Sequence, residues 1–337
     1  MNLETVSVVI PAHNRSEKLR RVLHYYSQTN IQIIVSDSSD VLFPYLNEFP
    51  KLKYFHFPKE QFLKKINNIL PYINTKYVVY CADDDFIVPQ AIEQCLNFLE
   101  LHPDYDSAQG HYLSFEMKKE RVYFSPGYIR NFDKDINQSL PSERLPEFRN
   151  LYASLLYSVI RASTFVNMYK KCMEGESLKF TNLFLAEIYF NFFSLMSGKN
   201  RTLQIFYGSR EKDYSSAYYT TVPLSVIRSS PEYKEEFQSF FNIIVNQLVS
   251  KQDLDLESSK YLLTGLLQDP KKDYINPFKR KMINLLNVYG PTEMMNKFFR
   301  YKYKLKALKI TKDMKSYPYN ISTPETECII YYISKYK

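Results

Sequence analysis

The chain has 337 residues, of which 45% are hydrophobic and 24% charged, and its formal net charge is +8. This length and composition predict about two globular domains with a substantial apolar core. Only 7 residues are glycine, and no two glycines lie closer than ten residues. That spacing excludes the G-x-G-x-x-G dinucleotide fingerprint, the G-x-x-x-x-G-K-[ST] phosphate loop and the G-x-S-x-G nucleophile elbow. We therefore expect any phosphate group to be bound by cationic side chains rather than by a glycine-rich loop.

The excess of positive charge lies mainly in the last third of the chain. Residues 231–337 hold 18 Lys and Arg against 12 Asp and Glu. Such a region predicts an anionic partner, which would be a nucleic acid, a phospholipid surface or a phosphorylated substrate. The alternative is a solvated basic face without a partner.

The 4 cysteines are scattered and form no C-x-x-C pair, which predicts reduced thiols in the cytosol rather than a metal knuckle or a disulfide framework. The opening segment MNLETVSVVIP lacks a basic region and indicates a buried strand rather than a signal peptide. No apolar run reaches the roughly 18 residues of a membrane span. We expect a cytoplasmic protein, either soluble or peripheral at the inner face of the membrane.

Strands and helices alternate over the first hundred residues. Apolar runs predict strands at 6–10, 31–35 and 77–80, and apolar residues at helical spacing predict helices at 17–28, 62–72 and 91–101. This alternation is typical of an α/β fold with a mixed, mainly parallel sheet and helices on both of its faces.

The middle of the chain predicts further strands and helices, and the end predicts helices alone. The expected elements are paired strands at 108–117 and 121–124, helices at 144–156 and 182–197, and strands at 157–161 and 203–207. From about residue 225 the pattern becomes helical and basic. We therefore expect an α/β domain over residues 1–222 and a basic helical domain over residues 223–337.

Polar residues follow each of the first three predicted strands. They are residues 11–14, Asp37, and the aspartate cluster, by which we mean Asp83, Asp84 and Asp85. Ligands of parallel sheets bind beyond the carboxyl ends of the strands, so we expect these residues to line one binding edge.

The aspartate cluster is the most informative feature of the sequence. Three adjacent carboxylates repel one another unless positive charge lies beside them, and a divalent cation with oxygen ligands would supply it. Mg²⁺ or Mn²⁺ bound there would stabilise the charge that develops on a departing diphosphate. The alternative is an Asp-rich segment that precedes the helix at Pro89 without binding a metal.

The segments VSVVIPAHNR, IQIIVSDSSD and YVVYCADDDFIVPQAIE occur in this order over residues 4–100. Together they resemble the nucleotide-sugar-binding half of family 2 glycosyltransferases, which have the GT-A fold. The segments LYSVIRASTF, FLAEIYFNFFSLMSGK and FYGSRE resemble a bacterial subgroup of that family linked to capsule and other surface polysaccharides.

The resemblance implies donor-binding roles for several residues. It places Pro11, His13 and Asn14 around the nucleobase, Asp37 at the base or ribose, Asn67 in the family's A-R-N-x-G segment, and Lys64 or Lys65 near the diphosphate. It also makes Asp84 and Asp85 the metal-binding pair. The first aspartate of the family's D-x-D-D motif falls on Ala82, so either Asp83 compensates or Asp83 and Asp85 form a D-x-D in a shifted register.

Inverting sugar transfer needs a carboxylate that accepts the proton of the attacking hydroxyl. The candidate is Glu187, the only charged residue between Lys179 and Lys199. The resemblance implies a Glu-Asp pair here, but Ile188 follows Glu187, so the role rests on Glu187 alone. The alternative is a structural ion pair of Glu187 with Arg161 or Arg210.

Arg210 follows a predicted strand and could bind the diphosphate with two hydrogen bonds. The alternative is a surface arginine whose neighbours are Glu211 and Asp213.

Residues 297–315 interleave basic and aromatic residues, with eight Lys and Arg against one Asp. This composition suits an anionic membrane surface, and suits a nucleic acid less because no known binding module is present. A solvated face is the alternative.

The sequence predicts a metal-dependent, inverting glycosyltransferase of surface polysaccharide biosynthesis. It would move a sugar from a nucleotide-diphosphate donor to a saccharide or a lipid-linked saccharide. Two alternatives remain open, namely a catalytically silent scaffold of a polysaccharide assembly complex and a transferase of a polyol-phosphate group.

Overall fold

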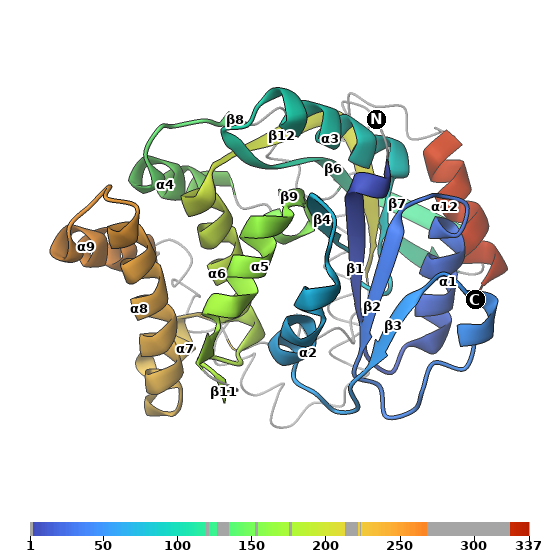
Figure 1. Cartoon of the computed structure of the whole chain (residues 1–337), viewed down its shortest axis with the longest axis horizontal. Helices are drawn as coiled ribbons and strands as arrows, with labels where there is room; N and C mark the ends of the chain where they lie inside the picture. The colour runs from blue at the N-terminus through green and yellow to red at the C-terminus, as the bar shows by residue number, and fades with distance from the viewer. Residues whose placement is uncertain are drawn as a thin grey trace.

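The computed structural model describes residues 3–118, 121–126, 135–151, 154–174, 177–212, 222, 224–267 and 324–336. Among these residues, a sheet of ten strands has the order β3-β2-β1-β4-β9-β6-β12-β5, with β7 paired to β6 and β8 paired to β12 (Figure 1). Its strands are β1 (Val6–Ala12), β2 (Gln32–Asp37), β3 (Lys53–His56), β4 (Tyr77–Tyr80), β5 (Phe86–Ile87), β6 (Tyr105–Lys118), β7 (Arg121–Pro126), β8 (Asp135–Ile136), β9 (Val159–Arg161) and β12 (Lys199–Glu211). A small separate sheet pairs β10 (Met173–Glu174) with β11 (Ser177–Leu178).

The sheet is mixed. Strands β1 to β4 are parallel to one another, as are β6 and β12, whereas β9 is antiparallel to both β4 and β6. All residues of β1 are buried, because apolar helices cover both faces of the sheet there. The expected α/β fold with a mixed, mainly parallel sheet is confirmed.

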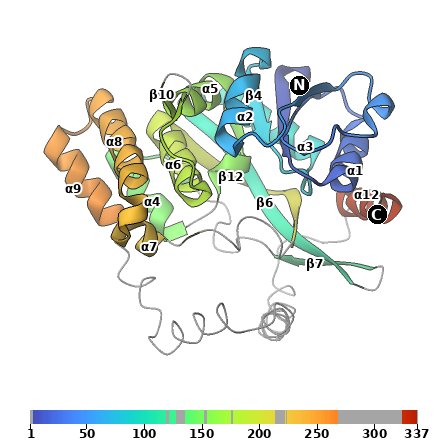
Figure 2. The ribbon, with the colours of Figure 1, turned by 90° about the horizontal axis from the view of Figure 1, so that it is seen from below.

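Helices cover the two faces of the sheet and form two apolar cores with it. They are α1 (Ser16–Tyr26), α2 (Phe62–Ile69), α3 (Pro89–Leu101), α4 (Pro141–Leu151), α5 (Ala162–Lys171), α6 (Leu183–Ser197), α7 (Leu224–Ser229), α8 (Lys234–Ser250), α9 (Leu256–Leu267) and α12 (Pro324–Lys335). One core holds residues of α1, α3 and α12, and the other holds residues of α2, α5, α6, α8 and α9. Figure 2 shows α8 and α9 at one end of the molecule, and α12 beside α1 at the other end.

The structure corrects several predicted boundaries. The helix expected at 144–156 is α4, which ends at Leu151, and a 3-10 turn, η5 (Leu155–Tyr157), follows it before β9. Strand β12 is longer than the expected 203–207, since pairing with β6 continues along it. Neither β3 nor α5 was predicted, because β3 is half-buried throughout and polar residues interrupt the apolar spacing of α5.

Gly198 ends α6, as expected, but not in the left-handed conformation of a typical C-terminal cap. Its φ is −174°, which any residue can adopt. The need for glycine is steric, because a Cβ there would lie 2.8 Å from the Cβ of Asp106.

Gly208 allows β12 to lie close against β5. A Cβ at this position would lie 2.3 Å from the carbonyl oxygen of Phe86 and 3.1 Å from the Cα of Ile87. Since β5 directly follows the aspartate cluster, this contact brings the end of β12 to that cluster.

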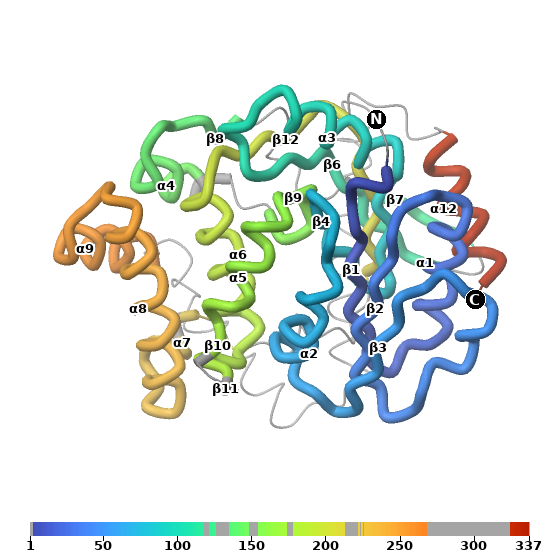
Figure 3. The backbone as a smooth tube through the Cα atoms, viewed as in Figure 1, coloured from blue at the N-terminus to red at the C-terminus, as the bar shows by residue number. Residues whose placement is uncertain are grey.

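The C-terminal helix α12 packs on the N-terminal part of the chain. The ring of Tyr336, just beyond α12, stacks on His24 of α1 with a centroid distance of 4.1 Å. Figure 3 shows the red C-terminal segment beside the blue α1. The basic segment 297–315 lies outside the described residues, and the division of the chain at residue 222 stays a prediction.

The described part of the chain contains no helix that is both long enough and apolar enough to cross a membrane.

A buried carboxylate links the sheet to two helices. Asp106 of β6 accepts hydrogen bonds from the hydroxyl of Thr164 on α5 (2.5 Å) and from that of Ser194 on α6 (3.2 Å). Burial raises the pKa of Asp106 from 3.8 to about 6, although both hydrogen bonds oppose the shift.

We expect Asp106→Asn to stabilise the protein relative to wild type increasingly as pH rises from about 4 to about 6. In this window the folded wild type binds more protons than the unfolded chain, so its stability falls with pH, by roughly 2–3 kcal/mol in total. Urea denaturation at a series of pH values measures the difference. A difference that does not change with pH would contradict the prediction.

We expect Gly208→Ala to lower the free energy of unfolding by about 1–3 kcal/mol, because its Cβ would collide with the backbone of β5. Gly265→Ala is the matched control, since a Cβ at this position of α9 meets nothing within 4 Å. The control should stabilise the protein by about 0.5–1 kcal/mol. Equal effects of the two variants in urea denaturation would show that the close approach at Gly208 is unimportant.

Candidate active site

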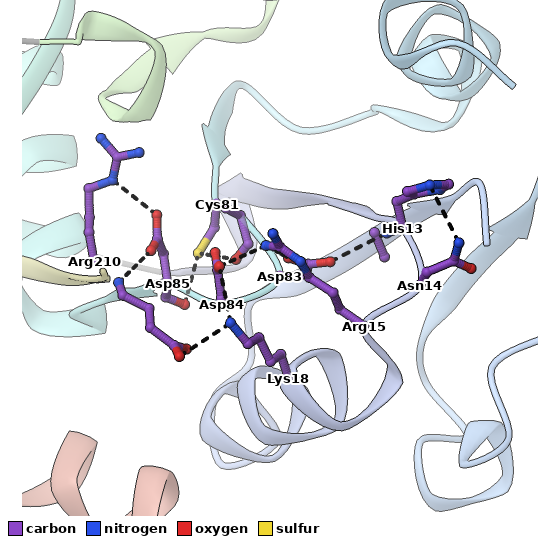
Figure 4. A network of polar contacts seen from close by, with 12 residues as sticks. His13, Asn14, Arg15, Lys18, Cys81, Asp83, Asp84, Asp85 and Arg210 are labelled. Carbon is purple, nitrogen blue, oxygen red and sulfur yellow. Dashed lines mark hydrogen bonds and ion pairs between the residues drawn. The ribbon is translucent and has the colours of Figure 1, made fainter. Parts of the chain in front are cut away.

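The aspartate cluster lies at the carboxyl end of β4, beside the carboxyl end of β1 (Figure 4). Its members Asp83, Asp84 and Asp85 are only 5%, 6% and 3% exposed. The backbone N–H of His13, just after β1, donates to Oδ2 of Asp83 at 3.4 Å. The structure therefore confirms that the polar ends of these two strands meet at one edge.

Two cations from the start of α1 hold the first two carboxylates. Nη1 of Arg15 lies 2.8 Å from Oδ2 of Asp84 and 3.4 Å from Oδ1 of Asp83. Nζ of Lys18 lies 3.7 Å from the same oxygen of Asp84. Neither Arg15 nor Lys18 was predicted as a site residue, although both come within four residues of Asn14.

The third carboxylate is held from the other side, by β12. Nε of Arg210 lies 3.1 Å from Oδ2 of Asp85, and the backbone N–H of Glu211 donates to Oδ1 of Asp85 at 3.0 Å. Arg210 also lies over the ring of Tyr157, 4.2 Å from its centroid, and donates to its hydroxyl at 3.0 Å. Arg210 is thus a member of the cluster's charge network.

Glu211 is a fourth carboxylate at this site that sequence reasoning missed as a functional residue. Its Oε2 lies 2.5 Å from Nη2 of Arg21, and its Oε1 lies 3.2 Å from Nζ of Lys18. Arg21 is buried between the rings of Phe86 and Phe115. Nothing in the local sequence indicates this pair, because its members are 190 residues apart.

Burial dominates the electrostatics of the cluster. It raises the pKa of Asp83 to about 7, with a further rise from the charge of Asp84 and a partial opposition from Arg15. It likewise raises the pKa of Asp85 to about 7, against the nearby Arg210. Burial also raises the pKa of Asp84, although Arg15 and Lys18 oppose the shift. The carboxylates therefore favour whatever brings additional positive charge to this edge.

The residues after β1 and β2 form a second polar wall of the site. His13 and Asn14 are exposed, and Nδ1 of His13 lies 3.1 Å from the hydroxyl oxygen of Ser38. Asn14 has a φ of 53° and accepts a hydrogen bond from the N–H of Asp40 at 3.0 Å. Pro11 lies inside β1 and is buried. His13 and Asn14 are thus open to a ligand at this end.

Asp37 and Lys65 lie behind this wall. Asp37 accepts hydrogen bonds from Ser39, through both its N–H (2.8 Å) and its hydroxyl, and from the hydroxyl of Tyr54 at 2.7 Å. Lys65 donates to the carbonyl of Ala12 at 2.5 Å, and burial lowers its pKa to about 8. These contacts join the ends of β1 and β2, so both side chains support this polar wall. Their predicted contacts with a donor stay predictions.

Asn67 lies on α2 and is half-buried. Its predicted role at the donor likewise stays a prediction.

Glu187 lies half-buried in the second turn of α6. Its carbonyl accepts a hydrogen bond from Nδ2 of Asn191 at 2.7 Å, and Oδ1 of Asn191 accepts one from the N–H of Leu155 at 2.6 Å. Leu155 begins η5, which ends at Tyr157, the partner of Arg210. The backbone of α6 at Glu187 is therefore connected to the aspartate cluster through the turn η5.

The two arginines considered as partners of Glu187 have other partners in the structure. Arg161 donates to the carbonyls of Tyr105 and Leu99, each at 2.9 Å, and Arg210 pairs with Asp85.

The cluster fits a divalent cation only in part. Its carboxylate oxygens are the ligands that Mg²⁺ prefers, and Arg15 and Lys18 both approach Oδ2 of Asp84. Within the described ranges, however, no group of three His, Cys, Asp or Glu side chains could hold a metal ion. Mg²⁺ often uses one or two carboxylates and completes its shell with phosphate oxygens. The site thus fits a cation that a bound diphosphate helps to hold.

The comparison with known families identifies the N-terminal part of the chain. Residues 7–152 match the sequence model of the family described as Glycosyl transferase family 2. This part of the chain is thus similar to family 2 glycosyltransferases. The expected resemblance to this family and the expected glycosyltransferase class are confirmed. No curated protein sequence matches the chain.

Solved structures of S. aureus TarS share the fold. TarS 1–349 in complex with UDP-GlcNAc has a TM-score of 0.52 and 15% identity, and the match covers 88% of this chain and 78% of that one. TarS 1–349 alone has a TM-score of 0.51 and 14% identity, with 89% and 78% covered. The chain spans 43% of a longer S. aureus TarS structure that it also matches. The expected GT-A fold of the glycosyltransferase is confirmed.

We expect Glu211→Gln to lower the free energy of unfolding by about 3 kcal/mol, because it leaves the buried guanidinium of Arg21 without its carboxylate. Glu48→Gln is the control, since its pair with Arg20 is more exposed and should contribute much less to stability. Guanidinium denaturation compares the two variants. The prediction fails if both variants unfold at the same denaturant concentration.

Proposed function

We propose that this chain transfers a sugar from a nucleotide-diphosphate donor to a hydroxyl of a saccharide or lipid-linked saccharide, with inversion at the anomeric carbon. The observation that carries the proposal is the aspartate cluster of a family 2 domain, buried at the carboxyl ends of the sheet and surrounded by Arg15, Lys18 and Arg210. The motifs in the second half of the chain support a role in surface polysaccharide biosynthesis. UDP-GlcNAc is the first donor to test, because TarS 1–349, which has the same fold, was solved in complex with it.

The donor would lie across the edge formed by β1, β2 and β4. His13 and Asn14, exposed after β1, would contact the nucleobase, and the wall built by Asp37 and Lys65 would hold them in place. Arg210, which reaches the cluster from β12, would contact the diphosphate. The cations Arg15, Lys18 and Arg210 make this edge a suitable place for a leaving group that carries negative charge.

Asp84 and Asp85 would hold Mg²⁺ or Mn²⁺ together with oxygens of the diphosphate. Such a cation stabilises the charge on the departing diphosphate. Because burial and mutual repulsion raise the pKa values of the cluster, positive charge bound there is favoured.

Glu187 would accept the proton of the acceptor hydroxyl as that oxygen attacks the anomeric carbon. Its position in α6 supports this role, because η5 connects α6 to Tyr157 and hence to Arg210 on the donor side. An attack from the face opposite the leaving group inverts the anomeric carbon, so a single carboxylate on that face suffices.

A lipid-linked acceptor would place the enzyme in the cytoplasm, at the inner face of the membrane. The excess of Lys and Arg in residues 231–337 supports peripheral contact with anionic lipids.

A second candidate is a catalytically silent scaffold. It is favoured by the alanine at position 82 and by the full engagement of Asp85, both of whose oxygens contact β12. A scaffold would bind a nucleotide sugar weakly or not at all, and would not cleave it.

Release of UDP from UDP-GlcNAc in the presence of Mn²⁺ tests the proposal. We expect Asp84→Asn to lower turnover at least about a hundredfold, because the carboxylate that holds positive charge near the leaving group is lost. Glu100→Gln is the control, since Glu100 pairs with Lys76 at the opposite end of β4. Absence of turnover and of binding across a panel of nucleotide sugars would support the scaffold instead. Cleavage of a polyol-phosphate donor alone would support a transferase of a polyol-phosphate group.

We expect Glu187→Gln to lower turnover by about a hundredfold to ten-thousandfold while UDP affinity stays unchanged, because the proton acceptor acts only in the chemical step. Calorimetry with UDP and steady-state kinetics on one preparation measure both quantities. Unchanged turnover would remove Glu187 from the mechanism.

A further inference from the structure

Lys18 occupies an unusual position between two carboxylates that come from distant parts of the chain. Its ammonium lies 3.7 Å from Oδ2 of Asp84 and 3.2 Å from Oε1 of Glu211. It belongs to the first turn of α1, which begins beyond the carboxyl end of β1. Figure 4 shows its side chain reaching from α1 towards the cluster.

Each carboxylate around the cluster lies in an ion pair. The carboxylates of Asp83, Asp84, Asp85 and Glu211 are paired with Arg15, Lys18, Arg21 and Arg210. A nucleoside diphosphate that arrives at this edge brings negative charge close to these four carboxylates. Binding therefore requires that a cation enters with the ligand or that a cation of the network exchanges a carboxylate for a phosphate.

The four cations differ in their freedom to make this exchange. The side chain of Arg21 is 6% exposed and lies against Phe86 and Phe115, and Arg210 is stacked on Tyr157. Arg15 bridges two carboxylates, with its shorter contact at 2.8 Å.

The side chain of Lys18 is 25% exposed, close to those of Arg15 (26%) and Arg210 (29%), but its ammonium lies 3.7 Å from Asp84, farther than Arg15 lies from Asp84 or Arg210 from Asp85. A lysine ammonium is a compact charge on a flexible stem, so it changes partner at a lower cost than a stacked guanidinium.

We propose that Lys18 is a diphosphate-binding cation that Asp84 and Glu211 hold in place until the donor arrives. The inference rests on the proposed function and adds Lys18 to the residues expected to bind the diphosphate. When the diphosphate binds beside Asp84, the ammonium turns from the two carboxylates to a phosphate oxygen. No bond forms or breaks in this step, and Lys18 stays charged throughout.

The test is calorimetry of UDP and of uridine with wild type, Lys18→Met and Lys18→Arg. We expect Lys18→Met to weaken UDP binding by roughly tenfold to a hundredfold, which is the value of one hydrogen bond to a charged group. Uridine affinity should stay unchanged, because uridine has no phosphate. Lys18→Arg should keep most of the UDP affinity, since it restores the charge. Lys76→Met is the matched control, as it removes a paired lysine at the opposite end of β4.

Three results would overturn the proposal. They are an unchanged UDP affinity in Lys18→Met, an equal loss for UDP and uridine, and a loss in Lys76→Met as large as that in Lys18→Met. These results are distinct from failure of the proposed function, which would appear as the absence of UDP binding by the wild type. Thermal denaturation shows whether Lys18→Met is folded. If Lys18→Met is unfolded, the folded Lys18→Arg variant provides the test. A loss of UDP affinity in Lys18→Arg as large as that expected for Lys18→Met would contradict a role that depends on the charge of Lys18.

Discussion

The structure depends on the burial of three adjacent carboxylates at the end of a parallel strand. Each carboxylate taken out of water must be compensated, and the fold compensates this cluster from two directions. The start of α1 supplies Arg15 and Lys18, and the end of β12 supplies Arg210 and the N–H of Glu211. The length of β12 and its close approach to β5 at Gly208 bring Arg210 and Glu211 to the cluster.

How far the sequence predicts this arrangement depends on how local each contact is. The strand ends and the aspartate cluster follow from continuous apolar runs and from the rule for parallel sheets, and the structure confirms both. The partners of the cluster do not follow, because Asp85 meets Arg210 across 125 residues and Arg21 meets Glu211 across 190. Such contacts depend on the register of β12 against β6, which includes irregularities that no local pattern encodes.

Aromatic side chains connect the aspartate cluster to α6. The carbonyl of Tyr157 accepts hydrogen bonds from the hydroxyls of Tyr112 (3.1 Å) and Tyr207 (2.9 Å), while its own hydroxyl accepts one from Arg210. The η5 turn is thereby anchored to the sheet, and through Asn191 to α6. The high content of tyrosine, 30 residues, thus contributes buried hydrogen bonds as well as apolar area.

Strand β12 places Arg210 and Glu211 next to each other, and neighbouring residues of a strand point to opposite faces of the sheet. Arg210 contacts Tyr157 on one face, and Glu211 contacts Lys18 and Arg21 of α1 on the other. Deletion of one residue from the short interval of β12 that ends at Glu211 would bring Glu211 to the place of Arg210 and Lys212 to the place of Glu211, so that a carboxylate would face Asp85 and an ammonium group would face Arg21. Like charges would then meet on both sides of the sheet, so the length of this short interval is far more constrained than its individual side chains.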